Sequence, residues 1–145
     1  MKCALELSAM RANADKQYSF EQMLLDEQCK LKHNDIVAKT IEFCETIIGP
    51  ALEKCALQRQ TPQYSLRGKF QEDRIGNLIF YPLVREKRSY ANGQASETMD
   101  TSRAYDAFTI KNYLESYCYV VSWTEDWYKR YGWGDLKGVK LSVTI

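Results

Sequence analysis

The chain has 145 residues, of which 45% are hydrophobic and 12% aromatic, and its 20 basic and 19 acidic residues leave a net charge of +1. This length and composition predict a single globular domain, and the balanced charge removes the simplest argument for a nucleic-acid or membrane-surface protein. The sequence contains no apolar run long enough to cross a membrane, and Glu6 interrupts the first ten residues, which are too short for a signal peptide.

The cysteines are odd in number and form no C-x-x-C pair, so they do not read as a disulfide framework. Free, buried thiols in a reducing compartment explain them better, and we therefore expect a cytoplasmic protein. The five are Cys3, Cys29, Cys44, Cys55 and Cys118.

Residues 1–60 are predicted to form a helical half. Residues 1–17 have the alanine content of a helix, although their first positions alternate as in a strand. Ser19 followed by Gln22 fits a capping box, so a second helix is expected to begin there and to end at residues 33–35.

The main helix is predicted over residues 34–58, where an apolar residue recurs every three or four positions. Gly49-Pro50 interrupts this pattern, but because the apolar stripe continues we expect a kink or a brief restart and not a reversal. Thr61-Pro62 ends the helical half. The stripe consists of Val37, Ile41, Cys44, Ile48, Ala51 or Leu52, and Cys55.

Residues 63–145 begin with a predicted hairpin. Tyr64 to Phe70 alternate between apolar and polar residues, a polar turn follows at 71–77, and a second strand is predicted over Leu78–Lys87. Pro82 lacks a backbone N–H, so this second strand is expected to lie at an edge or to contain a bulge.

The stretch 88–105 is small, polar and without apolar rhythm, with a turn signal at Asn92-Gly93. A loop of this length is uncommon in a compact domain and indicates a functional segment, disorder or an element that the pattern does not reveal.

The stretch 106–133 has two interpretations. Its apolar spacing and Thr109 as a cap favour an aromatic-rich helix ending at Gly132 and Gly134, whereas the β-branched and aromatic residues of 117–123 would suit a strand. We favour the helix. Residues 138–145 then alternate clearly, which predicts a final strand with Val139, Leu141, Val143 and Ile145 facing the core.

The order of these elements predicts an α+β single domain over residues 1–145. N-terminal helices would pack on a small, mostly antiparallel sheet of three or four strands, with an aromatic-rich C-terminal helix before the final strand.

Candidate catalytic groups are few. His33 is the only histidine, and Cys29 and Asp26 would lie near it on a helix, where the three could activate a thiolate or bind a metal. Because no second ligand cluster or catalytic motif accompanies them, a structural role is favoured. We therefore propose no catalytic residue, no metal and no cofactor; the sequence leaves open whether the protein is an enzyme and favours a non-enzymatic role.

Two features favour a binding role. From Gln63 to Gly93, six basic residues outnumber three acidic ones, and Arg67, Lys69, Arg85 and Lys87 would share one surface if the hairpin forms. Such a surface suits an acidic protein or a nucleic-acid backbone, although lysine and arginine on a strand also discourage edge-to-edge aggregation.

Aromatic residues gather in the C-terminal segment, where one helix could not bury rings that point in every direction. Exposed tyrosine and tryptophan are typical of contact surfaces, while burial between the sheet and the N-terminal helices is the alternative. The candidate contact residues of this segment are Tyr119, Trp123 and Trp133.

The sequence is therefore interpreted as a non-enzymatic binding or regulatory protein that contacts another protein, or a second copy of itself as a homodimer. Nucleic-acid binding through the basic hairpin is the alternative, an enzyme without a recognisable motif is the third reading, and no membrane is expected as a partner.

Overall fold

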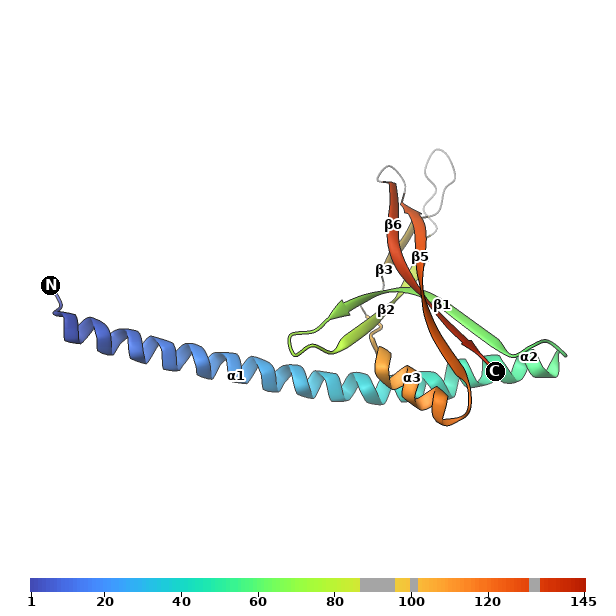
Figure 1. The fold of residues 1–145 in the computed structure, drawn as a ribbon, viewed down its shortest axis with the longest axis horizontal. Helices are drawn as coiled ribbons and strands as arrows, with labels where there is room; N and C mark the ends of the chain where they lie inside the picture. Colours follow the sequence, from blue (N-terminus) through green and yellow to red (C-terminus); the bar gives the residue numbers. More distant parts are fainter. Residues whose placement is uncertain (87–95, 100–101, 131–133) are drawn as a thin grey trace.

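A long N-terminal helix lying along an antiparallel sheet makes up the fold, which confirms the α+β class (Figure 1). The computed structural model describes residues 1–86, 96–99, 102–130 and 134–145. In chain order the elements are α1 (Ala4–Phe43), the π-helical turn η1 (Cys44–Ile48), α2 (Gly49–Leu57), β1 (Gln63–Glu72), β2 (Leu78–Glu86), β3 (Ser96–Met99), β4 (Tyr105–Asp106), α3 (Ala107–Ser116), β5 (Val120–Arg130) and β6 (Gly134–Thr144).

Helix α1 is a single element of 40 residues, so the expected breaks at Ser19 and at residues 33–35 are wrong. No glycine or proline occurs between Ala4 and Ile48, and nothing in that range prevents the series of backbone hydrogen bonds from continuing. A capping side chain stabilises a helix start only where the preceding residue leaves the helix, which does not happen here. At 1.5 Å per residue α1 is about 60 Å long.

The interruption at Gly49-Pro50 does not reverse the helix, and α2 restarts there, as expected. The wider turn η1 precedes it, and Pro50 follows in the first turn of α2. On the predicted stripe, Cys44, Ile48 and Leu52 are buried. Ile36, Thr40 and Phe43 are buried as well, outside that stripe.

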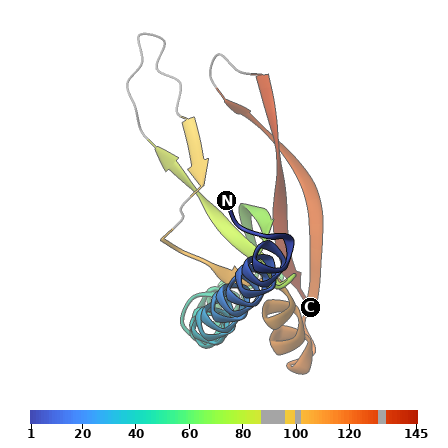
Figure 2. The same ribbon diagram turned by 90° about the vertical axis from the view of Figure 1, so that its left-hand side faces the viewer.

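The sheet has the strand order β3-β2-β1-β6-β5, with the short β4 paired to β2, and every pairing is antiparallel. Over the residues that the structure describes it therefore has five strands in line, and the expected three or four are wrong. Figure 2 shows that the β2–β3 and β5–β6 strand pairs diverge from each other above α1.

Strand β3 lies inside the stretch predicted as a loop. Its residues have no apolar rhythm, and they are held by pairing with Leu83–Glu86 of β2. The turn signal Asn92-Gly93 lies outside the described residues.

Strand β5 replaces the second part of the predicted C-terminal helix, so the prediction of a helix over 106–133 is wrong beyond Ser116. Cys118 has a φ of +68°, a left-handed conformation that ends the helical run. The β-branched residues that follow pair along the whole of β5 with β6. Tertiary pairing therefore outweighs the helical spacing of the apolar residues.

Pro82 is not on an edge strand, since β2 lies between β1 and its outer neighbours. The outer neighbours leave a gap, however: β4 pairs with residues 79–80 and β3 with residues 83–86. Pro82, which has no backbone N–H to donate, thus lies in this gap, where the outer side of β2 has no pairing partner among the described residues.

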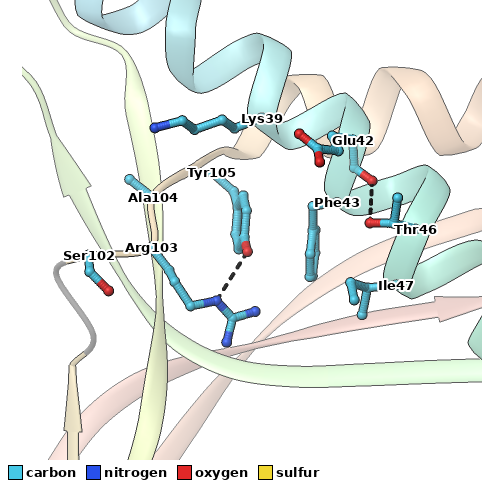
Figure 3. A pocket seen from close by; sticks show the side chains of 9 residues that line it. All are labelled: Lys39, Glu42, Phe43, Thr46, Ile47, Ser102, Arg103, Ala104 and Tyr105. Carbon is cyan, nitrogen blue, oxygen red and sulfur yellow. Dashed lines mark hydrogen bonds between the residues drawn. The ribbon is translucent and has the colours of Figure 1, made fainter.

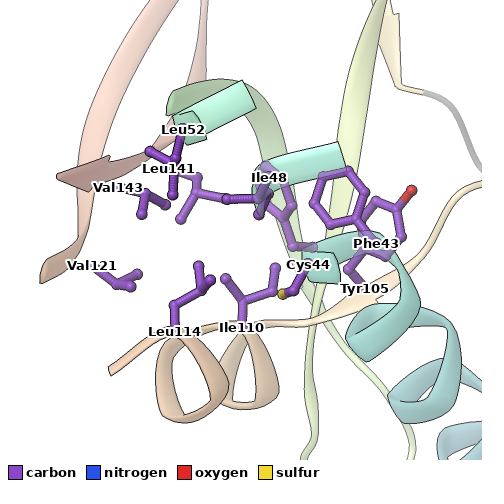
Figure 4. Close-up of a cluster of buried hydrophobic side chains, with 11 residues drawn as sticks. Phe43, Cys44, Ile48, Leu52, Tyr105, Ile110, Leu114, Val121, Leu141 and Val143 are labelled. Atoms are coloured by element: carbon purple, nitrogen blue, oxygen red, sulfur yellow. The ribbon is translucent and has the colours of Figure 1, made fainter. Parts of the chain in front are cut away.

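The core lies between α1, η1, α2 and α3 on one side and the inner sheet face on the other (Figure 4). Phe80 is fully buried over Gly68, where an added Cβ would lie 2.4 Å from its ring, so β1 has glycine at this contact. Leu141 and Val143 are buried as predicted, whereas Ile145 is 66% exposed because it follows the last strand, so that prediction is wrong.

Candidate interaction surface and neighbouring polar sites

The outer face of the sheet carries a group of cations. In β1, Leu66 and Phe70 pack against the core, so by strand alternation Arg67 and Lys69 lie on the opposite face. The register places Arg67 directly opposite Lys140 of β6, and Lys69 directly opposite Tyr81 of β2.

Hydroxyl groups surround these cations on the same face. Ser142 of β6 pairs with Ser65 on one side and with Ser122 on the other, and Thr124 lies opposite Lys140. Among the described side chains at these alternate positions of β1, β5 and β6 there is no carboxylate. We refer to Arg67, Lys69 and Lys140, with these four hydroxyl residues, as the basic face.

The structure thus brings together two of the four predicted hairpin cations and adds Lys140. Sequence alternation places Lys140 on the solvent side, but only the β1–β6 register shows that it meets Arg67. The backbone of Arg85 pairs with Glu97 of β3, and its side chain lies outside the described residues. Lys87 and Trp133 also lie outside them.

Tyr119 and Trp123 are half-buried on the core side of the sheet. The Trp123 ring centroid is 4.9 Å from that of Phe70 and 5.1 Å from that of Phe80. These contacts place Trp123 in the packing between β1, β2 and β5, and only part of its ring is accessible.

A shallow hollow of about 380 Å³ lies between α1 and the segment before β4 (Figure 3). The rings of Phe43 and Tyr105 stack at 4.1 Å, and the Arg103 guanidinium lies 5.6 Å from the Tyr105 centroid. Arg103 Nε donates a hydrogen bond of 3.1 Å to the Tyr105 hydroxyl. Lys39 and Glu42 also line the hollow, so α1 contributes one cation and one carboxylate to its wall.

The buried carboxylate of Asp106 connects α1 to the start of α3. It accepts hydrogen bonds from His33 Nε2 at 2.9 Å and from the backbone N–H and hydroxyl of Thr109 at 2.9 and 2.7 Å. The Asp106 backbone N–H donates to Thr40 Oγ1. Asp106 is thus the N-cap of α3, and Thr109, which the sequence proposed as the cap, is the residue that it caps.

Cys29, His33 and Asp26 were predicted as a weak candidate for a catalytic or metal site. Their side chains lie against three different residues. His33 bonds to Asp106, Asp26 forms an ion pair of 2.7 Å with Arg74, and Cys29 lines the same hollow as Asp73. Partial burial raises the pKa of Asp73, but hydrogen bonds from Asn77 and Ile75 outweigh this effect and lower it. These contacts tie the hairpin to α1.

Within the described residues, no three histidine, cysteine, aspartate or glutamate side chains are arranged to hold a metal ion. In the same part of the chain, no helix combines the length and apolar character needed to cross a bilayer. Comparison of the chain with protein-family models, with curated proteins and with solved structures returned no match.

Proposed function

We propose that the protein acts by binding a partner protein that carries an acidic surface, and that the basic face is the contact site. The observation that carries this proposal is the direct opposition of Arg67 and Lys140 on neighbouring strands. A face that gathers cations in this way favours a partner surface of opposite charge.

The composition of the basic face suits carboxylate recognition. Arginine can bind a carboxylate through two parallel N–H donors, and the serine and threonine hydroxyls add neutral donors around it. The buried side chains of β1 and β6, in contrast, lie on the other face of these two strands. The proposal therefore rests on the basic face and not on Tyr119 and Trp123, whose rings pack toward the core.

Nucleic-acid binding is the second candidate, and one observation favours it. The half-buried Tyr81 pairs with Lys69 in the sheet register and borders the hollow beside α1, so an aromatic residue is next to a cation, as in sites that bind single strands. Phosphate contacts would make the affinity fall steeply with salt concentration, which separates this candidate from a protein partner.

The test uses charge reversal on the basic face with a matched control. The variant Lys69→Glu/Lys140→Glu is compared with Lys54→Glu/Lys111→Glu, which makes the same charge change on exposed helix positions. Each is used to capture partners from extracts of the cells that produce the protein, with and without nuclease, and circular dichroism checks the fold.

We expect the wild type and the control variant to retain a protein that the basic-face variant does not retain. Nuclease treatment should not change this retention. Equal capture by both variants would refute the proposal. Loss of the captured material after nuclease treatment would favour nucleic acid instead.

A further inference from the structure

The N-terminal part of α1 projects beyond the sheet as an arm (Figures 1 and 2). All of residues 1–21 are exposed, and the first side chains of α1 that bond to the β1–β2 hairpin are Gln22 and Asp26, both to Arg74 in its turn. Residues 1–25 nevertheless carry large exposed apolar side chains on several sides of the helix, among them Leu7 at 55%, Tyr18 at 64% and Phe20 at 60%. Such exposure is costly in water unless another surface covers it.

One face of the arm has the spacing of a two-helix contact. Steps of alternately four and three residues connect six positions, as at the contact positions of a heptad. These are Leu7, Arg11, Ala14, Tyr18, Glu21 and Leu25. A surface with this spacing fits another helix lying nearly parallel or antiparallel to it.

The six positions are complementary to themselves when the direction is reversed. If a second arm runs antiparallel about a two-fold axis near residue 16, Leu7 meets Leu25 of the second copy. Ala14 then meets Tyr18, a small side chain against a large one. Arg11 meets Glu21, and the symmetry repeats each of these contacts once.

A parallel pair in the same register lacks this complementarity. It would place Arg11 against Arg11 and Glu21 against Glu21 in the middle of the contact, where like charges oppose association. The charge pattern therefore selects the antiparallel arrangement.

The same face continues toward the sheet. Leu25, Cys29 and Ile36 line a hollow of about 320 Å³ that also borders Ile79 and Tyr81 of β2. The first turn of an antiparallel second arm would end beside this hollow, so the contact would join the arm to the rest of the molecule.

From the complementarity of this face we infer that the arm binds a second copy of this chain, forming a homodimer through two antiparallel α1 helices. This contact uses residues of α1 and none of the residues of the basic face, so it does not depend on the proposed function. Its chemistry is an apolar helix pair with two symmetric arginine–glutamate contacts.

Variants in which the two charges are exchanged test the inference. Their dimer dissociation constants are measured by analytical ultracentrifugation. Arg11→Glu alone and Glu21→Arg alone should each weaken dimerisation by at least about tenfold, because each places like charges in both symmetric contacts. The double variant Arg11→Glu/Glu21→Arg should restore it. A monomeric wild type, or a double variant no tighter than the single variants, would overturn the inference.

A second comparison separates this face from general apolar exposure. Leu7→Asp/Tyr18→Asp should give a monomer, whereas Phe20→Asp/Leu31→Asp, the same change on another side of α1, should leave the dimer intact. Circular dichroism confirms that both variants keep their helix. Loss of the dimer in both, or in neither, contradicts the proposed face.

Disulfide formation tests the direction, in a background where the exposed native cysteines are replaced by serine. Gln17→Cys lies near the proposed axis and should cross-link to its symmetry mate. Leu7→Cys should not, because two copies of residue 7 would be about 27 Å apart along the helices. Cross-linking of Leu7→Cys without Gln17→Cys would show a parallel pair and refute the antiparallel contact.

Discussion

Replacing Asp106 by alanine tests the polar connection between α1 and α3. The substitution removes the N-cap of α3, which costs about 1 kcal/mol, and the bond from His33 to a buried charged group, which contributes about 1.5–3 kcal/mol. We expect the free energy of unfolding to fall by about 2–4 kcal/mol, since the Asp106 side chain is only 6% exposed. For a chain of this size that corresponds to a midpoint roughly 6–15 °C lower.

The assay is thermal and urea unfolding followed by circular dichroism, with Asp15→Ala, on the exposed arm, as the control for loss of one carboxylate. A double-mutant cycle with His33→Ala isolates the coupling, which should lie between about 0.5 and 3 kcal/mol for two groups in direct contact. If Asp106→Ala loses no more stability than Asp15→Ala, or if the cycle gives no coupling, the connection does not hold α1 to α3.

Two further predictions concern the core. Gly68→Ala should lower the free energy of unfolding in urea by about 1–3 kcal/mol, because its Cβ would lie 2.4 Å from the fully buried Phe80 ring. The control Ser65→Ala, on the exposed face of the same strand, should lower it by less than about 0.5 kcal/mol. Equal losses would contradict the close contact. Burial, with a smaller effect of Glu45, raises the pKa of the Cys44 thiol to about 11 from a usual value of 9, so the neutral thiol is favoured in the folded state. Its contribution to stability is complete below pH 9 and is lost between about pH 9 and 11, so unfolding free energies measured across that range should fall more steeply for the wild type than for Cys44→Ala; parallel curves would show that this thiol is not responsible.

The parts of the fold that sequence analysis predicts are those in which local pattern and tertiary packing agree. The alternation of β1 and β6 defines both strands, and the side chains that alternation turns inward, such as Leu141 and Val143, are buried. The turn between β1 and β2 is also local: Asp73 accepts hydrogen bonds from the backbone N–H groups of Ile75 and Asn77.

The parts that it misses depend on a partner distant in the chain. β3 has no apolar rhythm of its own and exists because β2 pairs with it. The sequence of β5 is compatible with a helix as well as with a strand, and its pairing with β6 decides in favour of the strand. The same limit applies to the basic face, since alternation predicts Arg67 and Lys69 but the register that brings Lys140 opposite Arg67 is a tertiary property. Asp106 carried a local signal, an aspartate three residues before Thr109, that the helix prediction for 106–133 passed over.

The arm poses a separate physical question, because a lone helix of about 20 residues is only marginally stable in water. Its cost of nucleation is already met elsewhere: Ile36, Thr40 and Phe43 are buried against the sheet and α3, so the arm only propagates a helix that the packed half has begun. Propagation without glycine or proline keeps the arm ordered, although it buries none of residues 1–21. An arm that is helical before it meets a second copy loses less conformational entropy on association than a disordered segment would. The unbroken α1, which the capping signals at Ser19 obscured, is therefore the property that makes the antiparallel contact favourable.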